Sequence, residues 1–519
     1  MPVANRQMYP QAALASAPLS PMIPTKNLST IRGTQEYEQA VDQIISNGIL
    51  KTTLAINKVI ASSAKDHARN IVFAPMSITG ALALILLGSN GKTFQEITSV
   101  MGLATGIEKL NVKSQIIHEQ FGRMIRKMEA KSGIEVGKEV NIASAIFVQA
   151  DYPIRALYAE TARSIYGSEV LNVDFQKSSG LAQQNINSWV SSKTNGKITE
   201  IIADDLPQST RVVIVSAMYF KAQWEFPFFP GTTNKRPFYT NGRKSKATIE
   251  VEMMSNGGYF PYYKDHNLNC EVLGFPYKGN KTTMYVVMPF NSNKDVLKEL
   301  ELRITPEDIN RLVDSTVYTK AVLLFPKMRI ESTIDLKESL QSLGVKTLFD
   351  PSEANLGLLS PGVRGDIVKP MASSSIPVKA PLPLPVNRHS ENDNDVLIFS
   401  RLRDVSNCTT NTTTKLSRRI KEDVETLDSI RTYINEQSSD NNFMNPGLYA
   451  DRVVHKVFMD ITESGTEAAA STAISLSRDG SRIPFRVDVP FFFFIRHEET
   501  KTVFFWGSVN SPVPSFKIV

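Results

Sequence analysis

The segment Glu463-Ser-Gly-Thr-Glu-Ala-Ala-Ala-Ser-Thr-Ala-Ile-Ser-Leu-Ser-Arg-Asp479 decides how this chain is interpreted. Its small and polar composition is typical of an exposed loop. From Thr466 to Leu476, however, every second residue is small or apolar, and the residues between them are polar or small. That period of two is typical of a strand buried on one face. We therefore interpret the segment as a loop that is able to become a strand.

Approximate energies support this interpretation over that of a plain Ala/Ser surface loop. About ten new ladder bonds at ~1 kcal/mol each stabilise a strand by roughly 10 kcal/mol. Ordering the backbone costs about 1–2 kcal/mol per residue, which nearly cancels that gain. Burial of Ile474 and Leu476 adds about 1.5–3 kcal/mol each and favours the inserted strand. No charged residue lies on that face between Thr466 and Leu476, and an uncompensated charge there would oppose burial.

Two apolar runs follow the segment. Val489-Pro-Phe-Phe-Phe-Phe-Ile-Arg-His497 and Thr502-Val-Phe-Phe-Trp-Gly507 flank a short charged turn. Apolar runs separated by such a turn predict a buried β-hairpin.

The loop and the hairpin together resemble the reactive-centre loop and the C-terminal strands of the serpin family. Further stretches occur in the family's order, and the resemblance covers about residues 45–361 and 448–515. These stretches are Asn70-Ile-Val-Phe-Ala-Pro-Met-Ser77, Ile186-Asn-Ser-Trp-Val190, Thr194-Asn-Gly-Lys-Ile198, Ala217-Met-Tyr-Phe-Lys221, Val251-Glu-Met-Met254, Phe325-Pro-Lys327 and Val454-His-Lys456. The resemblance implies an α+β serpin fold, with helices around a large central β-sheet, further sheets and an exposed reactive-centre loop.

Composition excludes several classes of protein. A hydrophobic content of 42% and a charged content of 21% are those of an ordinary globular chain. The net charge of +6 is mild for 519 residues and does not indicate a nucleic-acid partner. Only Cys270 and Cys408 are present, so no disulfide framework is expected. No apolar run reaches the ~20 residues of a membrane span.

The chain is predicted to divide into four parts. Residues 1–44 form a disordered tail, 45–361 and 448–519 form the two parts of the serpin domain, and 362–447 form an insertion. The reactive-centre loop occupies 463–484. The insertion begins with a Pro-rich stretch typical of an extended spacer. Its residues 414–437 have the spacing of an amphipathic helix, which either docks a partner or folds back on its own domain, unless the polar sequence stays disordered.

The expected location of the protein depends on the resemblance. The first residues hold no signal-peptide core, whereas many serpins are secreted. We expect an extracellular protein, with a cytoplasmic one as the alternative. The glycosylation sequons at Asn27, Asn280, Asn407 and Asn411 are about as many as chance provides.

No motif predicts an enzyme. The stretch Gly88-Ser-Asn-Gly-Lys-Thr93 resembles a phosphate-binding loop but has two residues between its glycines where four are needed. Neither G-x-S-x-G nor H-E-x-x-H occurs. The six histidines show no metal-ligand spacing. We therefore expect no catalytic residues, no metal and no required cofactor.

The resemblance instead implies a suicide-substrate inhibitor that acts as a monomer and forms a covalent complex with a serine protease. The small inward residues Thr466, Ala468 and Ala470 favour this function over that of a non-inhibitory binding, carrier or chaperone serpin. The hinge that starts the insertion is expected at Glu463, Gly465, Thr466, Glu467, Ala468, Ala469, Ala470, Ser471 and Thr472.

The bond that the protease attacks has three candidates. The residue before the attacked bond enters the specificity pocket of the protease and is called the bait residue. The family's usual spacing from Gly465 places it at Asp479, which would suit an aspartate-specific, intracellular protease. A shift of one residue gives Arg478, and a longer loop gives Arg482, cleaved before Ile483. An exposed Arg fits a trypsin-like pocket that carries a carboxylate, and Arg478 is the favoured candidate.

The resemblance implies two further features. A buried polar cluster that controls sheet opening is expected at Ser77 and His455, which could share a hydrogen bond. At two partner positions, where the family has Ser and Asn, this chain has Ala74 and Ser216.

The other feature is a basic stripe in the predicted helix 118–131. Arg123, Arg126, Lys127 and Lys131 are spaced to share one face. In some serpins such a stripe binds sulfated polysaccharide. A plain solvated helix face is the alternative.

Overall fold

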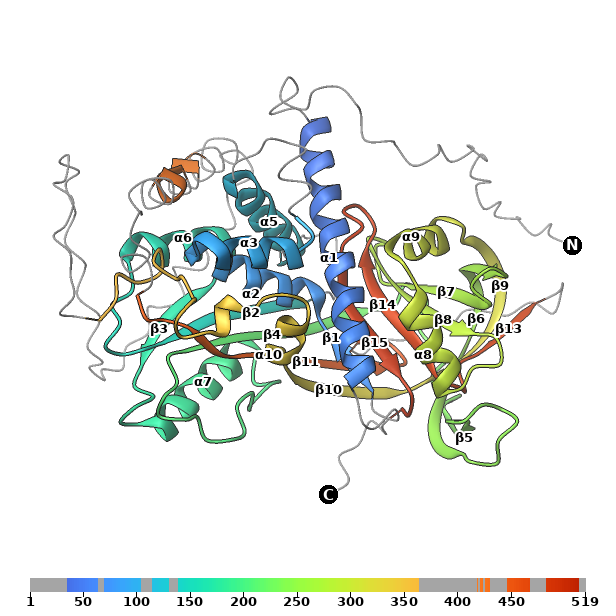
Figure 1. Cartoon of the computed structure of the whole chain (residues 1–519). Coiled ribbons are helices and arrows are strands. Elements are labelled where there is room, and N and C mark those ends of the chain that lie inside the picture. Colours follow the sequence, from blue (N-terminus) through green and yellow to red (C-terminus); the bar gives the residue numbers. More distant parts are fainter. Residues whose placement is uncertain are drawn as a thin grey trace, which may run out of the picture.

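Two β-sheets and the helices packed against them form the body of the computed structural model (Figure 1). The structure describes residues 35–63, 70–103, 114–129, 139–363, 418, 421–422, 425–429, 446–466 and 482–512. Its helices are α1 (Gln35–Ser63), α2 (Pro75–Gly88), α3 (Gly91–Val100), α5 (Ser114–Glu129), α6 (Ala156–Tyr166), α7 (Ser179–Lys193), α8 (Lys294–Arg303), α9 (Pro306–Asp314), α10 (Lys337–Ser342) and the 3-10 turn η2 (Thr347–Phe349).

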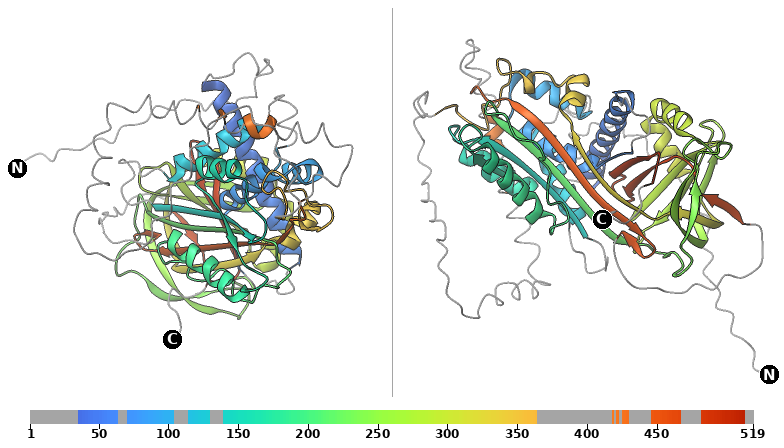
Figure 2. Two further views of the ribbon diagram at one scale, coloured as in Figure 1. Left: turned by 90° about the vertical axis from the view of Figure 1, so that its left-hand side faces the viewer. Right: turned by 90° about the horizontal axis from the view of Figure 1, so that it is seen from below.

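Six of the described strands form the sheet that matters most for function. Their order is β10 (Met328–Asp335), β11 (Ala450–Thr462), β12 (Gly465–Thr466), β4 (Val212–Gln223), β2 (Glu139–Gln149) and β3 (Glu169–Val173). The long strands β4 and β11 also pair directly and in parallel, from Val212 with Ala450 to Tyr219 with Phe458. The right-hand view of Figure 2 shows these two strands, green and orange, side by side.

This sheet is buried on both faces because its strands are apolar at successive positions. In β4, Ile214, Met218 and Phe220 face the larger core, whereas Val215 and Tyr219 face a smaller core against α7. Figure 1 shows α2, α3, α5 and α6 on one side of the sheet and α7 on the other. Helix α2 is buried at every residue, as expected of a helix that is apolar all round.

The second sheet contains nine strands within the described ranges. Its order is β1 (Ile71–Phe73), β15 (Val503–Val509), β14 (Phe491–His497), β8 (Thr282–Pro289), β7 (Cys270–Pro276), β6 (Ile249–Asp265), β9 (Val317–Pro326) and β13 (Ile483–Arg486), with β5 (Asn234–Phe238) paired to β6. The predicted hairpin is confirmed, because β14 and β15 are antiparallel neighbours and buried throughout. Gly507 allows this close packing, since a Cβ there would lie 2.3 Å from the Phe493 ring.

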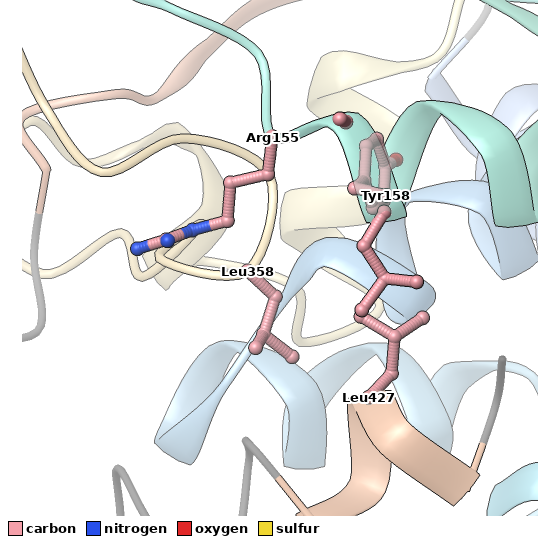
Figure 3. Close-up of a pocket in the computed structure, with 6 residues that line it drawn as sticks. Arg155, Tyr158, Leu358 and Leu427 are labelled. Atoms are coloured by element: carbon pink, nitrogen blue, oxygen red, sulfur yellow. The ribbon is translucent and has the colours of Figure 1, made fainter. Parts of the chain in front are cut away.

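One short helical piece of the predicted insertion packs on the domain. Leu427 is only 2% exposed, and it borders a cavity of about 310 Å³ beside Arg155, Tyr158 and Leu358. Figure 3 shows the Leu427 side chain directed toward the first turn of α6. In the part of the insertion that the structure describes, Leu427 therefore packs against its own domain.

We expect Leu427→Ala to lower the thermal stability of the uncleaved protein. Truncation of a buried Leu costs about 2 kcal/mol or more, and the neighbouring cavity places this site at the low end. Thermal melts followed by circular dichroism measure the shift. Ser429→Ala, an exposed change two residues away, is the control and should leave the melting temperature nearly unchanged. Equal melting temperatures for Leu427→Ala and the wild type would show that the contact contributes nothing.

Candidate functional site

The segment singled out by the sequence begins at one end of the six-stranded sheet. After β11, a turn at Glu463–Ser464 reverses the chain into the two-residue strand β12. Thr466 pairs antiparallel with Ile461 of β11 and with Ala222 of β4. The first residues of the loop therefore already lie between β4 and β11.

Gly465 is required at this entry point. Its φ of +146° is a backbone conformation that side chains strongly disfavour. A Cβ there would lie 2.1 Å from the carbonyl oxygen of Ala222. Only glycine allows the chain to enter between the two strands at this point.

Glu463 anchors the turn. Its carboxylate accepts a hydrogen bond from Thr233 Oγ1 at 2.7 Å and pairs with Lys327 Nζ at 3.2 Å. Partial burial would raise the pKa of Glu463, but the Thr233 hydroxyl, the backbone and the Lys327 ammonium together hold it below its ordinary value. Trp224 completes the anchor, because its indole N–H donates to Thr462 O at 3.0 Å and its backbone N–H donates to Ser464 O at 3.1 Å.

The far end of the loop is held by the other sheet. Ile483 starts β13, which pairs in parallel with β9 from Ala321 onward. Arg482 lies half-buried just before it. The hinge positions Glu467, Ala468, Ala469, Ala470, Ser471 and Thr472 and the bond candidates Arg478 and Asp479 lie outside the described residues. For these positions the interpretation stays a prediction.

The expected polar cluster lies under the junction of β4 and β11. The backbone N–H of Ala74 donates to His455 Nε2 at 2.9 Å, so Nδ1 carries the proton of the neutral ring. Nδ1 lies 3.1 Å from Ser216 Oγ, which lies 2.6 Å from Ser77 Oγ. Ser77 and His455 are therefore not bonded directly, because Ser216 lies between them. The cluster links α2, β4 and β11, and separation of β4 from β11 breaks the bond between Ser216 and His455.

The buried imidazole gives the protein a predictable response to acid. Burial lowers the pKa of His455 to about 3, whereas a histidine in the unfolded chain binds a proton near pH 6.5. Between these values the unfolded state holds more protons, so stability is lost as pH falls below 6.5. The loss is at most about 1.4 kcal/mol per pH unit.

We expect the melting temperature of the wild type to fall more steeply from pH 7 to pH 5 than that of His455→Gln. Glutamine can still accept a hydrogen bond from Ala74 N but does not titrate. Differential scanning calorimetry at matched ionic strength measures both curves. Parallel curves would mean that His455 titrates alike in the folded and unfolded states.

Ala74 occupies the N-cap position of α2 without a side chain that caps the helix. Its φ of −110° and ψ of 98° already suit an N-cap residue. We expect Ala74→Ser to raise stability by about 1 kcal/mol, because the added hydroxyl accepts from a free N–H in the first turn of the helix. Thermal melts of the uncleaved protein measure the gain. Ala74→Cys adds at the same place an atom that is larger than oxygen and only a weak acceptor, so it should not reproduce the gain. Equal effects of the two variants would refute the capping explanation.

The predicted basic stripe lies partly in α5. Arg126 Nη1 donates to Ile165 O at 2.9 Å, and Arg123 Nη1 lies 3.4 Å from Gln120 Oε1. The Arg126 guanidinium is therefore held at the C-terminal end of α6. The side chain of Lys127 and the whole of Lys131 lie outside the described residues. Binding of a sulfated polysaccharide here stays a prediction.

Candidate metal sites, disulfides and membrane-spanning helices are absent among the residues whose side chains the structure describes. No group of three potential metal ligands occurs among them. Cys270 is buried and unpaired. None of the helices in the described ranges is long and apolar enough to cross a membrane.

The loop thus begins between two long strands of a sheet, and comparison with known proteins identifies the family. A model of the family "Serpin (serine protease inhibitor)" matches residues 50–378 and 424–512. The chain belongs to the serpin family. Residues 379–423, which the match leaves out, lie inside the predicted insertion. By its family the chain is a member of the protease inhibitors and not an enzyme.

Similar proteins include inhibitors by name. "Serine protease inhibitor 28Dc" of Drosophila melanogaster is 28% identical, over 93% of this chain and 85% of its own. The leukocyte elastase inhibitor of Equus caballus is 25% identical, over 89% and 98%. Human thyroxine-binding globulin has the same fold, with a TM-score of 0.67 at 21% identity over 91% of this chain and all of that one.

Proposed function

We propose that this protein is a suicide-substrate inhibitor of a trypsin-like serine protease. The observation that carries the proposal is the position of β12, which holds the start of the loop between β4 and β11 while these strands still pair directly farther along. β4 and β11 thus still pair along most of their length, while the first two residues of a strand between them are already in place.

The register of β12 supports insertion of the whole segment. If the loop continued in that register, Thr472 would lie opposite both Ser216 and His455. Leu476 would lie opposite Val212, the first residue of β4. Residues of the predicted inward face would then meet Phe220, Met218 and Ile214 of the larger core. The sheet is therefore long enough for the segment up to about Leu476, and the candidate bonds begin just beyond it.

The chemistry of trapping follows from this arrangement. The protease serine attacks the carbonyl carbon of the bait residue, the peptide bond to the next residue breaks, and its nitrogen leaves with a proton as a new amino terminus. The bait carbonyl remains esterified to the serine. Insertion of the freed segment then carries the acyl-enzyme away from β13, and loop insertion of this kind is a known serpin transition.

The anchoring of β13 favours Arg478 as the bait residue. A protease needs extended residues on both sides of the bond that it cuts. Ile483 already pairs with Ala321 of β9, so attack before Ile483 would require β13 to leave its sheet. Asp479 would need a protease with a basic specificity pocket. Arg478 lies farthest from the anchor and fits a pocket that carries a carboxylate.

A panel of trypsin-like proteases tests the proposal. We expect at least one to form a 1:1 complex that survives SDS, and mass spectrometry of the released C-terminal peptide should place its first residue at Asp479. The same protease with its serine chemically blocked is the control and should form no such complex. Rapid cleavage of the loop by every protease without any complex would instead indicate a non-inhibitory serpin.

A further inference from the structure

Large apolar side chains are exposed beside the anchor of the loop. Of the six that are most exposed in the described part of the chain, four lie on β6 and β9. They are Tyr259 at 60%, Tyr318 at 58%, Val317 at 68% and Val322 at 40% exposed. Single exposed apolar residues need no explanation, but a group of them on neighbouring strands marks an interaction surface.

The strand pairing places most of this group on one face. Tyr259 of β6 lies opposite Lys320 of β9, and Tyr318 and Val322 lie two residues to either side of Lys320. Because side chains alternate along a strand, these residues point to the same side. Val322 also lies opposite Pro484 of β13, which is itself exposed. We call Tyr259, Tyr318, Val322 and Pro484 the outer apolar face.

The length of the loop determines what can cover this face. Arg478 is five residues from Ile483, so it lies within about 18 Å of the start of β13. A trypsin-like domain of about 230 residues has a radius of gyration of roughly 17 Å. A protease engaged at Arg478 therefore also covers surface around β13, where the outer apolar face begins.

We propose that the outer apolar face is an accessory docking surface for the protease that attacks the loop. This inference rests on the proposed function. Tyrosine suits the role because its large, rigid ring gives contact area at little entropic cost and its hydroxyl remains hydrogen-bonded at a wet edge. The surface would speed association, whereas the fate of the acyl-enzyme depends on insertion at the distant six-stranded sheet.

The test uses the double variant Tyr259→Ser/Tyr318→Ser. The control is Leu181→Ser, an equally exposed apolar residue (58%) on α7. The second-order rate of inhibition is measured for each, together with the number of inhibitor molecules consumed per protease. The protease is the panel member that cuts the wild-type loop fastest. We expect the double variant to be slowed about ten-fold or more with unchanged stoichiometry, and Leu181→Ser to match the wild type.

Other outcomes separate the two proposals. A change of less than two-fold in the double variant, with complexes still formed, would overturn the docking surface and leave the inhibitor function intact. If no complex forms but the loop is cut about ten-fold more slowly in the double variant, the inhibitor function is wrong and the docking surface stands. If no protease of the panel cuts the loop, both proposals are overturned.

Discussion

Cleavage of the loop between Leu476 and Ile483 is expected to raise the melting temperature by roughly 5–20 °C. The freed segment gains about ten ladder bonds, and their stabilisation is close to the cost of ordering the backbone. Burial of Ile474 and Leu476 then adds a further ~3–6 kcal/mol in total. Each kcal/mol of stabilisation raises the melting temperature of a domain of 150–250 residues by about 2–4 °C, and that of a larger domain by somewhat less. The added burial energy therefore predicts the stated rise.

The intact loop is too short to reach this state. Ala222, where β12 pairs, and Val212, where β4 begins, are ten residues apart, or about 33 Å along the strand. Seven residues from Leu476 to Ile483 span at most about 25 Å. β13 lies beyond the end of the sheet at which β12 enters (Figure 1). Full insertion therefore requires either a cut in the loop or the loss of β13 from β9.

Differential scanning calorimetry before and after limited proteolysis measures the rise. The position of the cut is read by mass spectrometry. A nick elsewhere, within residues 364–417 of the predicted insertion, is the matched control because it frees no segment of the loop, and we expect no comparable rise from it. A loop-cleaved protein that melts at or below the temperature of the intact one would show that no insertion follows the cut.

Much of the fold could be predicted from the sequence because its strongest signals are local. The apolar runs of the C-terminal hairpin, the buried helix α2 and the order of short motifs along the chain all depend on neighbouring residues. The two sheets confirm the expected α+β architecture. The chain enters the six-stranded sheet at Gly465, a residue of the continuous pattern of glycine and small residues that singled out this segment.

What could not be predicted depends on contacts between distant residues. Ser77 and Ser216 are 139 positions apart, so the sequence did not indicate that Ser216 would bridge Ser77 and His455. The anchor of Glu463 likewise uses Thr233, 230 positions away. The outer apolar face was missed because Tyr259 and Tyr318 gather only when β6 and β9 pair. β6 shows no regular alternation of exposed and buried residues, so no local pattern in that strand indicated the face.

Ala468→Glu is expected to convert the inhibitor into a substrate. In the register of β12, residue 468 would lie opposite Phe220 and Met459, both fully buried in the larger core. Because both of these neighbours are apolar, a carboxylate there would oppose burial by several kcal/mol. Insertion would slow while hydrolysis of the acyl-enzyme continues. We expect unchanged cleavage of the loop, no complex in SDS, and a stoichiometry raised more than ten-fold.

The neighbouring substitution Ala469→Glu is a closely matched control. Residue 469 would lie opposite Tyr219 and Phe458, on the other face of the sheet. There the ammonium of Lys197 lies 5.8 Å and 6.0 Å from the centres of these two rings. The same carboxylate then meets a cation instead of an apolar core. Ala469→Glu should keep forming the complex, and equal behaviour of the two variants would mean that the loop does not enter the sheet in this register.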